Sequence, residues 1–83
     1  MLPVKSERIP RATIQRLAVY VQVLESMRRN GVEVISSGPL AEACDVNASQ
    51  VRKDLAYFGE FGVRGVGYHV ENLIEAIKVS LGV

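Results

Sequence analysis

The sequence predicts a mostly helical α+β domain of the winged helix-turn-helix class, with four helices, one short strand and a β-hairpin wing. Two observations predict this class. Two short helical segments joined by a tight turn stand in the middle of the chain, and a glycine-rich stretch with aromatic and branched residues follows them. Eighty-three residues suffice for one domain with one core. We therefore expect a basic N-terminal arm over residues 1–9 and one domain over residues 10–83.

The first helix is predicted to begin at Pro10 and to end near residue 30. Proline suits the first helical turn, where its missing N–H leaves no hydrogen bond unmade. Apolar residues then recur at spacings of three and four: Ile14, Leu17, Ala18, Val21, Leu24 and Met27. Val19, Tyr20 and Val23 widen the apolar arc. Two explanations stay open, packing on a partner or another domain and generous burial in one core.

One strand and a second helix follow. Residues 32–35 form a short run rich in β-branched residues, enough for one brief strand. A serine cap, Ser36 or Ser37, followed by Pro39 predicts a helix that reaches Cys44. Cys44 should face the core as a structural thiol rather than serve as a redox sensor.

The third helix is expected to open at Asn47, which is a favourable N-cap residue. Gln50 stands three residues later, where it could reach back as in a capping box. Gly59 should end the helix, and the complete helix-turn-helix region spans roughly residues 17–58. Three apolar residues recur at i, i+4 and i+7 and should face the core: Val51, Leu55 and Phe58.

The opposite face of the third helix is polar and basic. At about 100° of rotation per residue, its centre and edges carry Ser49, Gln50, Arg52, Lys53, Ala56 and Tyr57. Asp54 falls near the buried side. Arg and Lys bond the acceptor pair of guanine, Gln bonds adenine through two hydrogen bonds, and small residues allow contact with thymine methyls. Ordinary exposed helices more often mix Glu with Lys, so this face predicts base reading in a major groove.

Residues 59–69 predict the wing. Four glycines are interspersed with aromatic and branched residues, a pattern typical of a hairpin. Arg64 would stand at its tip, where an arginine can enter a narrow A·T-rich minor groove; a plain tight hairpin is the alternative. Gly65 and Gly67 do not begin a dinucleotide-binding motif, because a valine stands where the third glycine belongs. A last helix is expected over residues 70–81.

Composition excludes several classes of site. The net charge of +1 does not by itself indicate a nucleic-acid partner. The sequence before residue 17 nevertheless holds four basic and one acidic side chain, which predicts a polarised surface, although scattered solvated charges would also fit. Cys44 is the single cysteine, and His69 has no partner nearby for catalysis or metal binding. We expect no enzyme, no metal site and a cytoplasmic protein.

Three strings of the sequence carry a resemblance to a known family: IPRATI at residues 9–14, QVRKDLAYFG at residues 50–59 and RGVGY at residues 64–68. They closely resemble the N-terminal winged-helix domain of Rex, a family of bacterial redox-sensing transcriptional repressors. The resemblance implies a homodimer that binds an inverted-repeat, A·T-rich operator and leaves it when NADH rises relative to NAD⁺. It also implies that NAD(H) binds a following Rossmann domain absent from this chain, so we expect no cofactor here.

The resemblance also implies roles for single residues. Arg52 and Lys53 would contact bases or phosphates, and Arg64 would contact the minor groove. Further contacts to the DNA backbone are implied for Arg11, Arg16, Gly65, Gly67 and Tyr68.

The chain departs from the commoner family pattern at three positions, where Ala18 replaces a proline, Ala56 a serine and Val63 a lysine. These departures bear on the strength and sequence preference of binding. A winged helix used only for contacts with other proteins is the alternative function.

Overall fold

The computed structural model describes residues 9–58 and 67–82 of the chain. Within them the helices are α1 (Arg11–Arg29), α2 (Ser37–Cys44), α3 (Ala48–Leu55) and α4 (Val70–Leu81), and the 3₁₀ turn η2 (Ala56–Phe58) continues α3. Strands β1 (Val34–Ile35) and β2 (Tyr68–His69) pair antiparallel, with Val34 opposite His69 and Ile35 opposite Tyr68.

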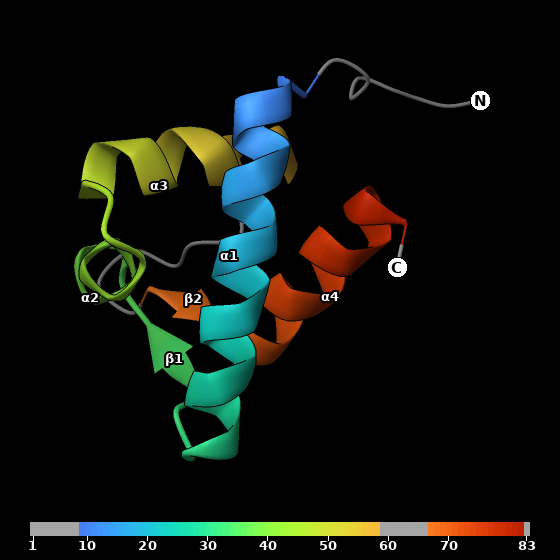
Figure 1. Cartoon of the computed structure of the whole chain (residues 1–83). Helices are drawn as coiled ribbons and strands as arrows, with labels where there is room; N and C mark the ends of the chain where they lie inside the picture. Colours follow the sequence, from blue (N-terminus) through green and yellow to red (C-terminus); the bar gives the residue numbers. More distant parts are fainter. Residues whose placement is uncertain (1–8, 59–66, 83) are drawn as a thin grey trace.

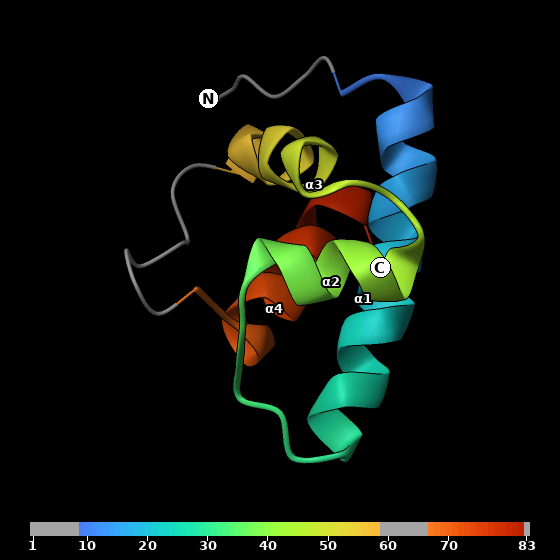
Figure 2. The ribbon, with the colours of Figure 1, turned by 90° about the vertical axis from the view of Figure 1, so that its left-hand side faces the viewer.

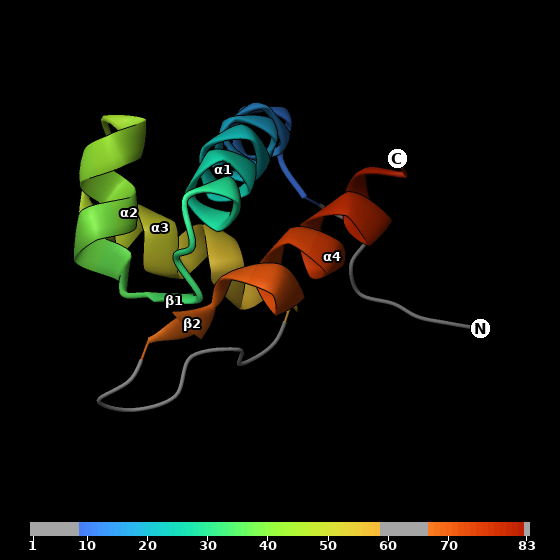
Figure 3. The ribbon, with the colours of Figure 1, turned by 90° about the horizontal axis from the view of Figure 1, so that it is seen from below.

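The helices surround one core: α1 packs against α4 and α2, and in Figure 1 it runs between α2 and α3 on one side and α4 on the other. Seen from below, α2 and α4 lie on opposite sides of α1, and the two strands lie beneath them (Figure 3). In Figure 1, α2 is seen along its axis while α3 is seen from the side; in Figure 2, which is turned by 90°, α2 is seen from the side and α3 nearly along its axis. The two helices therefore cross steeply, as in a helix-turn-helix motif. The predicted fold class is confirmed.

Helix α1 is rotated relative to the predicted apolar stripe. Leu17, Val21 and Leu24 are buried as expected, but Ile14 is 41% exposed and Ala18 also faces solvent. Tyr20 is fully buried in their place. The core accepts this tyrosine because its hydroxyl has a hydrogen-bond partner inside the protein, a partner that periodicity along one helix does not reveal.

The caps of α2 and α3 agree with the sequence in part. Ser36 is the N-cap of α2 in extended conformation, but its side chain makes no capping hydrogen bond. Asn47 caps α3 as predicted, since its Oδ1 accepts the Gln50 backbone N–H at 2.9 Å. The reciprocal half of the predicted capping box is wrong, because the Gln50 amide turns to Asp54 instead. The α-helix ends at Leu55, earlier than predicted, and tightens into η2.

Strand β2 joins β1 at a point where only glycine fits. Gly67 has a φ of +105°, and a Cβ added there would lie 2.7 Å from the carbonyl oxygen of Ile35. Beyond the strands, the Val70 N–H donates to the Glu33 carbonyl at 2.9 Å, which ties the start of α4 to β1. The remainder of the predicted wing, residues 59–66, lies outside the described residues, as do the arm residues 1–8.

Helix α4 matches its predicted bounds and buried face. Val70, Leu73, Ile74 and Ile77 are buried against α1, and the helix ends at Gly82 in the left-handed conformation, with a φ of +78°. None of the helices in residues 9–58 and 67–82 has the length and apolar character that crossing a membrane requires.

Candidate nucleic-acid interface

The outward face of α3 and η2 is exposed as the sequence predicts, except at Gln50, which is half-buried because its amide bonds Asp54. Ser49, Arg52, Lys53 and Ala56 are all exposed, and Tyr57 is 40% exposed. The opposite side of the helix is closed by Val51 and Leu55, which are 0% and 2% exposed. We call the exposed set (Ser49, Arg52, Lys53, Ala56 and Tyr57) the reading face.

The one carboxylate of α3 is withdrawn from the reading face. Asp54 is 1% exposed and accepts hydrogen bonds from three side chains. Arg16 donates through Nε to Oδ2 at 2.7 Å and through Nη2 to Oδ1 at 3.0 Å. The Tyr20 hydroxyl donates to Oδ2 at 2.6 Å, and Gln50 Nε2 donates to Oδ1 at 2.9 Å. Each carboxylate oxygen therefore has two donors.

The cluster of Asp54 with Arg16, Tyr20 and Gln50 holds a charged pair beneath the reading face. Burial is the largest single influence on the pKa of Asp54 and would raise it, but the hydrogen bonds from Arg16, Tyr20 and Gln50 together lower this pKa below its ordinary value. The hydrogen bond to Asp54 raises the pKa of Arg16. Burial, and then the same carboxylate, raises the pKa of Tyr20. Arg16 and Asp54 therefore stay ionised, and their charges cancel. The charged side chains that α3 exposes to solvent are then all basic.

This cluster also joins α1 to α3. Arg16 and Tyr20 stand four residues apart on α1, and Gln50 and Asp54 stand four apart on α3, so each pair shares a helix face. Arg16 Nη2 additionally donates to Thr13 Oγ1 at 3.1 Å, one turn earlier on α1. The backbone of α3 lies closer to α2 than to α1, and these polar side chains reach from α3 to the first half of α1.

Arg16 is the predicted site residue whose surroundings differ most from the expectation. Its guanidinium points to Asp54, and its side chain is 29% exposed. The family resemblance implies a phosphate contact for Arg16, whereas in the structure its guanidinium bonds Asp54. Asp54, Tyr20 and Thr13 were missed as members of this cluster. A carboxylate on the apolar side of a short helix is the signal that could have indicated an internal cation.

Arg52 and Lys53 differ in how they are held. Arg52 Nη1 donates to the Ser37 hydroxyl on α2 at 3.2 Å, an exposed contact that steadies the guanidinium.

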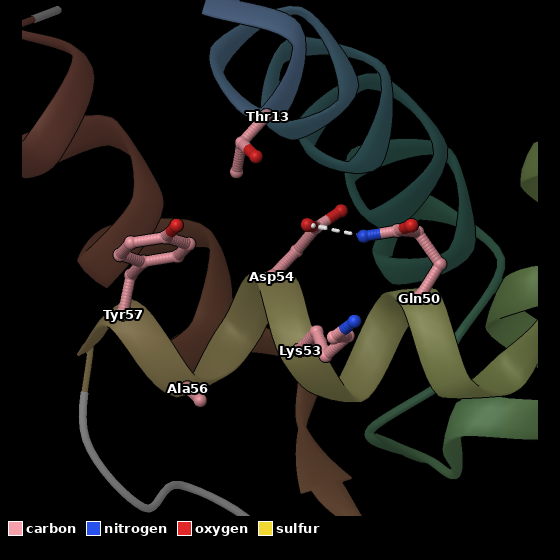
Figure 4. A pocket seen from close by; sticks show the side chains of 6 residues that line it. All are labelled: Thr13, Gln50, Lys53, Asp54, Ala56 and Tyr57. Atoms are coloured by element: carbon pink, nitrogen blue, oxygen red, sulfur yellow. Dashed lines mark hydrogen bonds between the residues drawn. The ribbon is translucent and has the colours of Figure 1, made fainter. Parts of the chain in front are cut away.

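Lys53 is exposed and lines a shallow hollow of about 400 Å³ between α3 and the start of α1. Figure 4 shows Asp54 and Gln50 on the side of α3 that faces Thr13, with Ala56 on the other side. The hollow is lined by Thr13, Gln50, Lys53, Asp54, Ala56 and Tyr57.

The other predicted DNA-binding residues fall on three parts of the chain. Arg11 is exposed at the first position of α1. Gly67 and Tyr68 lie in or beside β2, and Tyr68 packs partly against the core. Arg64 and Gly65 lie outside the described residues. The contacts of all these residues with DNA stay predictions.

Elsewhere in the described ranges there is little that suggests chemistry. No group of three or more His, Cys, Asp or Glu side chains in residues 9–58 and 67–82 could hold a metal ion. Cys44 is half-buried, and burial raises the pKa of its thiol, which disfavours the reactive thiolate.

Comparison with known proteins points in one direction. Residues 8–56 match a family model described as "Putative DNA-binding protein N-terminus". The chain is 71% identical over 79 residues to a protein of Maridesulfovibrio salexigens named redox-sensing transcriptional repressor Rex, covering 95% of this chain and 38% of that protein. A protein of the same name from Solidesulfovibrio magneticus is also 71% identical, with 36% of its length covered. The chain thus spans well under half the length of these relatives.

Solved structures give the same result. The chain is similar to RSP in complex with β-NAD⁺ and operator DNA, with a TM-score of 0.85 and 44% identity over 90% of this chain and 35% of that one. It is also similar to RSP described as a Rex-family repressor, with a TM-score of 0.78 and 42% identity, covering 89% of this chain and 34% of that one.

Proposed function

The chain belongs to the family of DNA-binding N-termini carried by Rex transcriptional repressors, and we propose that it binds double-stranded operator DNA and thereby represses transcription. The reading face carries this proposal. It combines two exposed cations with small side chains, and the one acidic group of α3 is buried and neutralised behind it. Arg and Lys at such positions bond guanine, and Ser49 and Ala56 permit close approach.

Around this helix we propose contacts that position the domain on the duplex. Arg11, exposed at the start of α1, binds a backbone phosphate. Arg64 enters the minor groove where it is narrow and A·T-rich, and Gly65, Gly67 and Tyr68 approach the sugar-phosphate chain beside it. Arg16 serves mainly the internal cluster, so its share in phosphate binding is small.

The proposed operator is an A·T-rich inverted repeat bound by a homodimer of the full-length repressor in the bacterial cytoplasm. Two-fold symmetry in the protein is mirrored by two half-sites in the DNA. The proteins related to this chain are named redox-sensing, and RSP was solved with β-NAD⁺ and with β-NADH. We propose that the full-length repressor responds to NADH, as the names of these relatives indicate.

Fluorescence anisotropy of the 83-residue chain with the operator duplex of the RSP complex tests the proposal. A scrambled duplex of the same composition is the control, and both titrations are made at two salt concentrations. We expect tighter binding to the operator, and log K falling against log[salt] with a slope of roughly −0.9 for each phosphate neutralised. Equal affinity for the two duplexes would contradict the proposal.

A second candidate function is contact with another protein through α1. Ile14 and Val19 are 41% and 44% exposed on that helix, and they are the apolar side chains that such a contact would bury. An apolar contact responds weakly to salt, whereas phosphate contacts respond strongly. If a partner rather than DNA were bound, Ile14→Ser and Val19→Ser would abolish binding, and Arg52→Ala would leave it unchanged.

A further inference from the structure

Gln50 belongs to the cluster around Asp54 and is itself only half-buried. Its backbone N–H is bonded to Asn47 and its side-chain Nε2 donates to Asp54 Oδ1 at 2.9 Å. The ionised carboxylate of Asp54 accepts and cannot donate. The amide must therefore turn its nitrogen, and not its oxygen, toward Asp54, which fixes an orientation that is otherwise ambiguous.

The rest of the amide is available. A glutamine amide has two N–H donors and one carbonyl acceptor, and Asp54 takes a single donor. Among the described residues the Gln50 side chain makes no other hydrogen bond. The residue is half-buried and lines the same open hollow as Lys53 and Ala56, although its side chain leaves α3 on the side that faces Thr13 (Figure 4). Its unused acceptor and donor can therefore meet a ligand that enters from the reading face.

Asp54 holds this orientation firmly. Its two oxygens already accept hydrogen bonds from Arg16 and Tyr20 on α1, and at 1% exposure water competes little for these bonds. An unrestrained glutamine side chain must lose rotamer entropy when it binds, and for so long a side chain this cost is among the larger ones. Gln50 has lost part of that freedom already in the free protein, which is the physical meaning of preorganisation.

We propose that Asp54 is a positioning residue for DNA recognition, and that it holds Gln50 so that the carbonyl and the adjacent N–H of the amide read one adenine. The proposal rests on the function proposed above. Adenine presents an N6 donor beside an N7 acceptor in the major groove, and a glutamine amide matches this pair. The Asp54 carboxylate takes the other amide proton, the one that points away from Oε1.

Binding measurements on three variants test the proposal. Gln50→Met keeps the length of the side chain and removes the amide, Asp54→Asn removes the charge at constant shape, and the third variant combines the two. Affinity is measured for the RSP operator duplex, for copies in which each A·T pair in turn is replaced by G·C, and for the scrambled duplex. Gln22→Met, at an exposed position of α1, is the matched control.

We expect the unmodified chain to lose about 5- to 140-fold in affinity when one particular A·T pair is replaced. Gln50→Met should abolish this discrimination while leaving affinity for the scrambled duplex within about twofold, and Gln22→Met should retain it. Asp54→Asn should weaken discrimination at the same pair. The double variant should discriminate no worse than Gln50→Met alone, because Asp54 acts through Gln50. Additive losses, or discrimination that persists in Gln50→Met, would overturn the inference.

Nuclear magnetic resonance of the unaltered chain tests the same geometry even if Asp54→Asn does not fold. The two side-chain amide protons of Gln50 are distinguished, with Gln15 and Gln22 as exposed references. We expect the proton that points away from Oε1 to resonate downfield in the free protein, and the other proton to shift when the operator duplex is added. The opposite assignment would overturn the inference. Equal affinity for operator and scrambled duplex would instead contradict the proposed function itself.

Discussion

Replacing Arg16 by methionine should destabilise the domain by about 2–4 kcal/mol. Methionine keeps the apolar length of the side chain and removes both donors to Asp54, at 2.7 and 3.0 Å. A hydrogen bond to a charged group contributes about 1.5–3 kcal/mol. The total is reduced because Arg16 is 29% exposed, so water can replace part of what is lost. Asp54 keeps Tyr20 and Gln50 as donors but has no countercharge.

Thermal unfolding measures this loss. For a chain of 83 residues a change of 1 kcal/mol shifts the melting temperature by about 4–8 °C, so we expect a decrease of about 10–30 °C. Arg11→Met, at an exposed position on the same helix, is the control and should change stability by less than about 0.5 kcal/mol. If the two variants had the same melting temperature, the hydrogen bonds from Arg16 to Asp54 would not stabilise the domain as the structure indicates.

The same variant has a characteristic pH dependence. The folded pKa of Asp54 is lowered, so this group stabilises the native chain above its unfolded pKa, about 3.9, and that contribution is lost as pH falls through the folded pKa. Without Arg16, burial raises the folded pKa of Asp54, so protonation stabilises the variant as pH falls. The stability difference between the two proteins should therefore shrink between pH 7 and pH 3; a constant difference would refute the reasoning.

Three further predictions concern separate sites. Arg52→Ala should weaken operator binding by about 1–3 kcal/mol and relax base preference; equal losses on scrambled DNA would contradict base reading. Gly67→Ala should destabilise the fold by about 2 kcal/mol or more, because φ is +105° and the new Cβ would meet a backbone carbonyl at 2.7 Å. Gly38→Ala, on a helix with open space around it, is the control and should be neutral or slightly stabilising. Lys78→Met breaks the 2.8 Å ion pair with Glu25 and should change the free energy of unfolding by less than about 1 kcal/mol, as urea titration would show.

Local patterns in the sequence sufficed for much of the fold. Helix α4 ends where Gly82 follows its apolar stripe, and Asn47 caps α3 through a bond that spans three residues. The reading face could also be predicted, because Val51 and Leu55 fix which side of α3 is buried. Each of these features depends on residues within one or two helical turns of each other.

The internal cluster could not be predicted in the same way. Arg16 and Asp54 are 38 positions apart, and no spacing rule within one helix joins them. Tyr20 was counted among the surplus apolar residues because its hydroxyl partner lies on another element. The burial of Tyr20 and the role of Arg16 both involve these contacts between α1 and α3, whereas the bond of Gln50 to Asp54 spans only four residues and competes with the capping box that the sequence predicts.

The division of α3 into two sides has a consequence for how such domains diversify. The side chains that face outward make few bonds with the rest of the protein, Arg52 with Ser37 being one of them, whereas Asp54 ties the inward side to α1. If the proposed function holds, substitutions at Ser49, Lys53 and Ala56 change which operators are recognised without disturbing the interior. A lineage would then retarget such a repressor to new promoters by altering a few surface codons while the scaffold is inherited unchanged.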